Sequence, residues 1–227
     1  MIPTFQAQWA HFHPSSWPLG QYIKDYDGEN LTRFHFLPLG RPHVLNRDEL
    51  KALIERMNTM ADAVLGDGSD VWLVQAQWAR PDRAPDMKTR NRLYRLRQRH
   101  GLKGDWEFYS QGSTQNFTIH SGLVTWRRNA FNRLFLDLYN LRVQDVLFMR
   151  ADDGAVFRPY AVGADVAMPS PKALIELVSG FYGWLPTHGR GFLRFNKDQM
   201  AGDGGKFTVG KSVAEAINKA IKAEGQD

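Results

Sequence analysis

Residues 145–160 read Asp-Val-Leu-Phe-Met-Arg-Ala-Asp-Asp-Gly-Ala-Val-Phe-Arg-Pro-Tyr, and this stretch decides the class of fold. Two largely apolar runs, 145–150 and 155–160, flank Asp152-Asp153-Gly154. An Asp-Gly pair between such runs is typical of a tight hairpin turn. The two aspartates could also bind a metal ion, but a turn is the simpler interpretation. We therefore predict two strands that pair directly.

Further elements follow on both sides of this hairpin. Apolar residues at helical spacing predict helices over 47–65 (capped by Asn46), 87–100, 127–141 and 170–184 (beginning at Ser170 and Pro171). Apolar or alternating runs predict strands over 31–37, 71–78, 105–110, 115–126 and 191–195, with a short one at 21–24. Because neighbouring strands pair directly, we expect an α+β fold: a mixed, largely antiparallel sheet flanked by helices.

The domain organisation follows from changes in composition along the chain. We expect one α+β domain over residues 1–195, of which 1–30 are irregular, rich in aromatic residues, Pro and Gly. Residues 196–211 are predicted as a Gly-rich linker. Residues 212–227 are predicted as a separate amphipathic C-terminal helix.

The bulk composition excludes several kinds of chemistry. The 227 residues include no cysteine, which rules out disulfides, cysteine-ligated zinc, iron–sulfur clusters and thiol nucleophiles. No apolar run approaches the ~20 residues that a membrane-spanning helix needs, and the N-terminus lacks the pattern of a signal peptide. We expect a cytoplasmic protein that does not engage a membrane.

Positive charge is concentrated in the predicted helix 87–100 and the residues just after it. The chain carries a net charge of +5, whereas residues 87–104 alone hold seven basic side chains and no acidic one, so the remainder sums to −2. Leu93, Leu96 and His100 form one narrow stripe of the helix. The predicted partner-binding residues are Lys88, Arg90, Arg92, Arg95, Arg97 and Arg99. Three interpretations remain open: a solvated flank paired with the protein's own acids, a surface for an acidic protein, or a nucleic-acid contact.

A phosphate-loop pattern near the C-terminus lacks the context that the motif needs. Residues 205–212, Gly-Lys-Phe-Thr-Val-Gly-Lys-Ser, match G-x-x-x-x-G-K-[ST], but no apolar strand leads into them and only fifteen residues follow. Ser212 and Glu215 are better explained as a helix capping box. The pair His11 and His13 lacks a nearby carboxylate. We therefore assign no catalytic residue, metal ligand or cofactor.

Four short stretches, in order along the chain, resemble an uncharacterised bacterial family, the domain of unknown function 3885. They are residues 33–38, 56–59, 157–165 and 184–188, and the resemblance spans about residues 31–193. The residues at the family-motif positions are Arg33, His35, Tyr160, Gly163, Asp165, Trp184 and His188.

One departure from the family pattern bears on function. Where the family has Asp-Gly after the tyrosine, this chain has Ala161-Val162, so a carboxylate that catalysis or metal binding could use is missing. Tyr160, Gly163 and Asp165 then fit a structural turn that docks a strand against the Trp184 helix. We place Asp165 after a strand end, where it could be exposed.

These observations favour a non-enzymatic binding protein. The partner that we expect is an acidic protein surface, such as a toxin or effector neutralised by a bacterial immunity-type protein, by analogy only. Nucleic-acid binding is the alternative. A second alternative is an enzyme, which would need Tyr160, Asp165, His188 and His35 to converge in one pocket.

Overall fold

The computed structural model describes residues 4–19, 30–37, 41, 43–79, 87–109, 116–186 and 193–194. The predicted linker 196–211, the C-terminal helix 212–227, the phosphate-loop pattern and the short strand at 21–24 lie outside these residues. The described residues contain five α-helices and eight strands.

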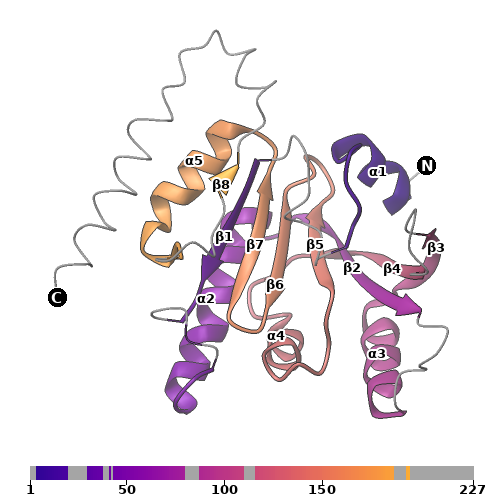
Figure 1. The fold of residues 1–227 in the computed structure, drawn as a ribbon, viewed down its shortest axis with the longest axis horizontal. Helices are drawn as coiled ribbons and strands as arrows, with labels where there is room; N and C mark the ends of the chain where they lie inside the picture. The colour runs from indigo at the N-terminus through magenta and orange to yellow at the C-terminus, as the bar shows by residue number, and fades with distance from the viewer. Residues whose placement is uncertain are drawn as a thin grey trace, which may run out of the picture.

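Eight strands form one sheet in the order β3-β4-β2-β5-β6-β7-β1-β8 (Figure 1). Every pairing among the described strands is antiparallel, so the α+β prediction is confirmed and no parallel pair occurs there. The strands are β1 (Asn30–His35), β2 (Asp70–Ala79), β3 (Lys103–Tyr109), β4 (Asn116–Thr125), β5 (Val146–Arg150), β6 (Val156–Tyr160), β7 (Gly163–Met168) and β8 (Leu193–Arg194). The helices are α1 (Phe5–Phe12), α2 (Arg47–Leu65), α3 (Met87–His100), α4 (Asn132–Tyr139) and α5 (Pro171–Gly180), followed by a 3₁₀ turn, Tyr182–Trp184.

The central hairpin forms as predicted. Strands β5 and β6 pair through Phe148 with Phe157 and Met149 with Val156. Gly154 has a φ of 75°, which glycine adopts without the strain that a side chain would bring. The Asp153 carboxylate accepts hydrogen bonds from the Arg150 guanidinium and from the Ala155 backbone N–H at 3.0 Å. This aspartate therefore stabilises the turn.

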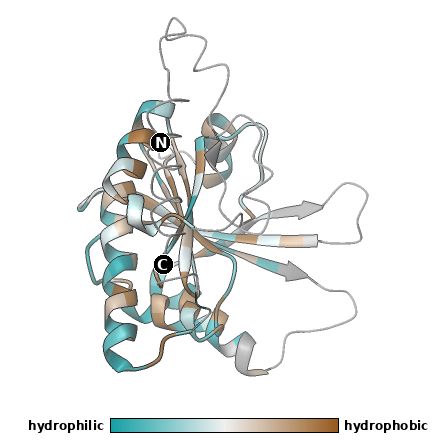
Figure 2. Ribbon diagram, turned by 60° about the vertical axis from the view of Figure 1, so that its left-hand side comes forward, coloured by the Kyte–Doolittle hydropathy of each residue, from teal (hydrophilic) through white to brown (hydrophobic). Residues whose placement is uncertain are grey.

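Helix α2 matches its predicted bounds because both ends carry strong local signals. Asn46 Oδ1 accepts from the backbone N–H groups of Asp48 and Glu49, at 3.0 and 2.9 Å. These are donors that the first turn of a helix otherwise leaves unpaired. Gly66 follows with a φ of 77° and ends the helix. The helix ribbons in Figure 2 alternate between hydrophobic and hydrophilic residues, as expected for helices that bury one face.

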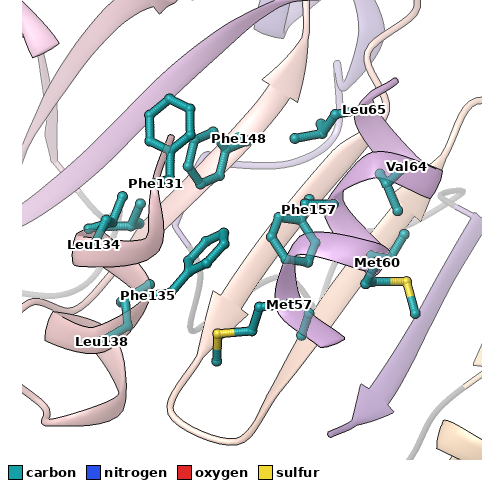
Figure 3. Close-up of a cluster of buried hydrophobic side chains, with 14 of the residues drawn as sticks. Met57, Met60, Val64, Leu65, Phe131, Leu134, Phe135, Leu138, Phe148 and Phe157 are labelled. Carbon is teal, nitrogen blue, oxygen red and sulfur yellow. The ribbon is translucent and has the colours of Figure 1, made fainter. Parts of the chain in front are cut away.

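The larger hydrophobic core lies between the sheet and helices α2, α3, α4 and α5. In Figure 3, Phe135 of α4 points toward Phe157 of the sheet, and Met57 and Met60 extend from α2 nearby. The Phe135 and Phe157 rings meet edge to face, with their centroids 6.3 Å apart. Interlocking aromatic rings of this kind add stabilisation beyond the area they bury.

A second, smaller core lies on the opposite face of the sheet, where α1 is seated. The prediction that residues 1–30 are irregular is wrong at Phe5–Phe12, which form α1. Phe5 and Trp9 are each only 1% exposed, and the Gln8 side chain accepts from the Trp72 indole. So short a helix gains its stability from tertiary packing, which local sequence patterns do not reveal.

Two other predictions need correction. Helix α4 begins at Asn132, not 127, because Asn129 has a φ of 68° and interrupts the helical path. Strand β7 was missed altogether, and Asp165, expected after a strand end and exposed, lies inside it with no exposed surface.

Candidate functional site

Helix α3 packs on the core through the narrow stripe of residues that was predicted from the sequence. Leu93 and Leu96 are buried, and His100 stacks on Phe131 with ring centroids 5.3 Å apart. The partial burial of the His100 ring and the neighbouring Arg99 charge lower the pKa of the imidazole. The rest of the helix surface consists largely of basic residues.

Arg97 differs from the other predicted partner-binding residues because it points into the protein. Its guanidinium donates to the side-chain oxygens of Gln75, at 2.9 Å, and of Gln77, both on β2. Burial lowers the pKa of Arg97. The hydrogen bonds of Arg97 therefore hold α3 against the sheet.

Four other arginines of α3 carry charge that the described residues do not neutralise. Arg90, Arg95 and Arg99 are exposed and Arg92 is half-buried. Within the described ranges, no aspartate or glutamate forms an ion pair with any of the four. Lys88 lies on the same helix, but its side chain is outside the description.

Three of these arginines line a cavity between α3 and the region of α4. In Figure 1, α3 lies beneath the sheet at its β2–β4 end, with α4 as the next helix. The cavity has a volume of ≈ 310 Å³. Its lining residues are Arg92, Arg95, Leu96, Arg99, Arg133, Leu134, Asp137, Arg142 and Val143.

The lining of this cavity is strongly cationic over an apolar base. Among the described lining residues, five guanidinium groups are opposed by one carboxylate, that of Asp137, which lies 3.5 Å from Arg133 and 3.5 Å from Arg142. The net charge of the lining residues is therefore +4. Leu96, Leu134 and Val143 are at most 7% exposed. We call this site the α3–α4 cavity.

Sequence reasoning missed the α4 side of the cavity. Arg133 and Arg142 lie more than thirty residues from α3, and only the folded chain brings them to the same space. The apolar spacing of 127–141 predicted a helix but gave no reason to connect its cations with those of residues 87–100.

The family-motif positions form a separate cluster on the α1 face of the sheet. Arg33 lies opposite Asp165 across β1 and β7, and Arg158 lies opposite Asp165 across β6 and β7. The Asp165 carboxylate accepts from Arg33 at 2.6 and 2.9 Å and from Arg158 at 3.1 Å. It has no exposed surface, so a substrate could not reach it without displacing these partners.

Tyr160 and Gly163 complete this cluster. The Tyr160 hydroxyl donates to the Phe34 carbonyl at 3.3 Å, and the Arg33 guanidinium lies 5.5 Å from the centre of the Tyr160 ring. Burial, followed by the Asp165 charge, raises the pKa of Tyr160, so the hydroxyl stays protonated. A Cβ on Gly163 would come within 2.3 Å of the Phe34 carbonyl oxygen. These contacts hold three strands in register.

The remaining motif residues differ in their positions. His35 lies two residues after Arg33 on β1, opposite Gly163. Trp184 packs against Phe36 on the other face of the sheet, with ring centroids 5.6 Å apart. His188 lies outside the described residues. The structure thus brings Arg33, Tyr160, Gly163 and Asp165 together but separates them from Trp184.

Two findings bear on metals and membranes. Among the described residues, no three His, Asp or Glu side chains are grouped to hold a metal ion. His13, one of the two candidate ligands near the N-terminus, has its Nε2 atom 2.8 Å from the Gly154 carbonyl oxygen. No helix in the described ranges combines the length and apolar character needed to cross a bilayer.

Comparison with known proteins gives one match. The family model described as Domain of unknown function (DUF3885) matches residues 19–189, which is more than half of the chain. The match begins after α1 and includes α3, α4 and the Arg33–Asp165 cluster. No curated protein and no solved structure matches.

Proposed function

The chain belongs to the family of the domain of unknown function DUF3885, and we propose that it is a non-enzymatic binding protein that holds an acidic protein partner through the arginines of α3. One observation carries the proposal. Arg90, Arg92, Arg95 and Arg99 have no acidic partner among the described residues, although the fold pairs many other arginines.

The contrast with the rest of the molecule is informative. Arg33, Arg128 and Arg150 each contact at least one carboxylate of the same chain. Like charges one helical turn apart destabilise a helix by about 0.2–0.5 kcal/mol per pair. Arg95 faces this repulsion from Arg92 on one side and from Arg99 on the other. A partner that supplies carboxylates would relieve it.

Arginine suits this role for physical reasons. Its planar head offers five donors that match carboxylate oxygens, and it is enriched at protein interfaces. A concentrated positive surface also steers an acidic partner toward the complex, and added salt weakens that attraction. The proposal extends, by analogy alone, to a bacterial, cytoplasmic immunity-type protein whose partner is a toxin or effector.

The two other interpretations receive less support. Tyr94 is exposed beside the arginines, but stacking of single-stranded bases needs several aromatic platforms. The enzyme hypothesis needs a reactive carboxylate, and Asp165 is both buried and fully engaged by two arginines.

The experiment compares two variants that lose the same charge at different places. The α3 triple variant carries Arg92→Gln, Arg95→Gln and Arg99→Gln. The control triple variant carries Lys51→Gln, Arg127→Gln and Lys172→Gln, whose wild-type side chains are 70, 62 and 72% exposed. Fluorescence anisotropy would follow binding of a labelled polyglutamate peptide and of a short DNA duplex at low salt and at about 0.15 M salt.

The expected result is that the wild type and the control triple variant bind the peptide, more weakly as salt rises, while the α3 triple variant does not. If the two triple variants bind the peptide equally well, the positions of the α3 arginines do not matter. Net charge, not this surface, would then be responsible for binding. A clear preference for DNA over the peptide would replace the acidic protein with nucleic acid as the partner.

A further inference from the structure

We propose that the α3–α4 cavity binds a small molecule that carries two or more phosphoryl groups. This inference goes beyond the proposed function, because the ligand is a small molecule and not a protein. It does not depend on whether a protein partner exists. Nothing in the family description assigns a ligand to these residues.

The size of the cavity limits what can enter it. Its ≈ 310 Å³ lies at the lower end of the range for small-molecule pockets, which is about 300–1,000 Å³. At about 30 Å³ of liquid volume per water molecule, it has room for roughly ten waters. A folded protein surface cannot enter such a space, whereas a compact anion can.

The charge of the lining indicates how much negative charge the ligand carries. The described lining residues include five arginines and one aspartate, which give a net charge of +4. A phosphomonoester carries about −1.5 to −2 at neutral pH, so two phosphoryl groups supply about −3 to −4. A single carboxylate supplies −1 and would leave most of the cationic charge uncompensated.

The arrangement of the arginines also favours phosphoryl groups. Arg92, Arg95 and Arg99 are spaced to lie along one flank of α3, and Arg133 and Arg142 come from the region of α4. A phosphoryl group offers three acceptor oxygens pointing in different directions, so guanidinium groups on opposite walls can engage it together. A carboxylate has only two oxygens in one plane.

The α4 wall of the cavity is held in place before any ligand arrives. Asp137 contacts both Arg133 and Arg142 through its carboxylate. Its backbone carbonyl also accepts from the Arg142 N–H at 2.8 Å and from the Val143 N–H at 3.4 Å. A preformed wall reduces the ordering cost of binding. The apolar base formed by Leu96, Leu134 and Val143 further strengthens charge–charge attraction, because it lowers the local dielectric.

The shared chemistry, linked or paired phosphoryl groups, occurs in nucleotides and in inorganic polyphosphate. Isothermal titration calorimetry with the full chain would use inorganic tripolyphosphate, a nucleoside triphosphate, orthophosphate and citrate. We expect one site per chain, with tripolyphosphate bound at least about tenfold more tightly than orthophosphate or citrate. If the nucleotide binds more tightly than tripolyphosphate, the phosphoryl groups belong to a nucleotide. If the two bind equally, the protein recognises the phosphate chain alone. Both results support the proposal.

Variants of the α4 wall separate this inference from the proposed function. Arg133→Gln and Arg142→Gln leave α3 intact, and each should weaken tripolyphosphate binding about tenfold, with folding checked by circular dichroism. The control triple variant should bind as the wild type does. Citrate bound as tightly as tripolyphosphate, no saturable binding, or affinity unchanged in both α4 variants would overturn the inference. The proposed function would survive any of these results if the α3 triple variant alone still lost the polyglutamate peptide.

Discussion

The Arg33 guanidinium donates to Asp165 across the β1–β7 pair, with Nε 2.6 Å from Oδ1, and the aspartate has no exposed surface. Arg158 reaches the same carboxylate from β6. The burial of Asp165 and its engagement by two arginines indicate that this motif holds three neighbouring strands together. The exposed arginines of α3 and the arginines that line the α3–α4 cavity are more accessible to a ligand.

Asp165→Asn should lower the free energy of unfolding by about 3–5 kcal/mol, because it removes the buried negative charge that the partly buried guanidinium groups of Arg33 and Arg158 share. Urea unfolding followed by circular dichroism would measure the loss. Asp48→Asn is the matched control, since it removes an ion pair to Lys51 in which the aspartate is 89% exposed. Its effect should stay below about 1 kcal/mol. Similar losses in both variants would show that the Asp165 cluster does not stabilise the sheet.

Gly163→Ala should be strongly destabilising, by more than about 3 kcal/mol, because the new Cβ would meet the Phe34 carbonyl oxygen at 2.3 Å. Backbone cannot move aside as a flexible side chain can. Gly180→Ala, at a site where nothing lies within 4 Å, is the control and should be neutral or stabilising by up to about 1 kcal/mol. Thermal unfolding of the two variants side by side checks the prediction, and a tolerated Gly163→Ala would contradict the packing of β1 against β7.

Trp9→Ala should cost about 3–5 kcal/mol, because this side chain is 1% exposed and fills the second core from α1. Leu45→Ala, at a residue 69% exposed, should change stability by less than about 0.5 kcal/mol. The family match begins only at residue 19, so a small effect at Trp9 would mean that α1 is an appendage, not part of the folded unit.

The His100 imidazole should make stability depend on pH. Partial burial, followed by the Arg99 charge, lowers its pKa below the ordinary value of 6.5. The unfolded chain therefore binds the proton more readily than the folded protein. The contribution of His100 is fully present above about pH 6.5 and is lost as the pH falls through the lower folded pKa.

Urea unfolding between about pH 8 and about pH 5 would test this dependence. On acidification, His100→Gln should lose less stability than the wild type. The loss in Arg99→Gln should lie between these two, because this variant removes the Arg99 charge, the second cause of the lowered pKa of His100. Identical pH profiles for the wild type and His100→Gln would contradict the assignment.

The sequence predicted those elements whose end signals and apolar pattern both lie within one short stretch of the chain. Helix α2 has its cap at Asn46 and its terminating Gly66, and the β5–β6 hairpin has its Asp-Gly turn. Strand β7 was not predicted, because residues 163–168 are mostly small and include a charged residue. Asp165 is tolerated inside the sheet because Arg158 and also Arg33, which is 132 residues away, neutralise it.

The candidate site was predictable only in part, for the same reason. The charge of α3 is visible in the sequence, and Arg92, Arg95 and Arg99 were identified from it. The role of Arg97 could not be predicted from the sequence, because its partners Gln75 and Gln77 lie on β2 and not on α3. Arg133 and Arg142 join the site through tertiary packing, which the spacing within a single helix cannot reveal.

Among the described residues, no carboxylate forms an ion pair with Arg90, Arg92, Arg95 or Arg99, and the stability of the α3 triple variant tests whether they are unpaired in the whole protein. Urea unfolding at low salt should show an unfolding free energy unchanged or raised by roughly 0.4–1 kcal/mol, from two like-charge pairs at about 0.2–0.5 kcal/mol each, and the gain should disappear at high salt. A loss of more than about 1 kcal/mol would mean that the chain's own carboxylates already hold these arginines, and the proposed acidic partner would lose its support.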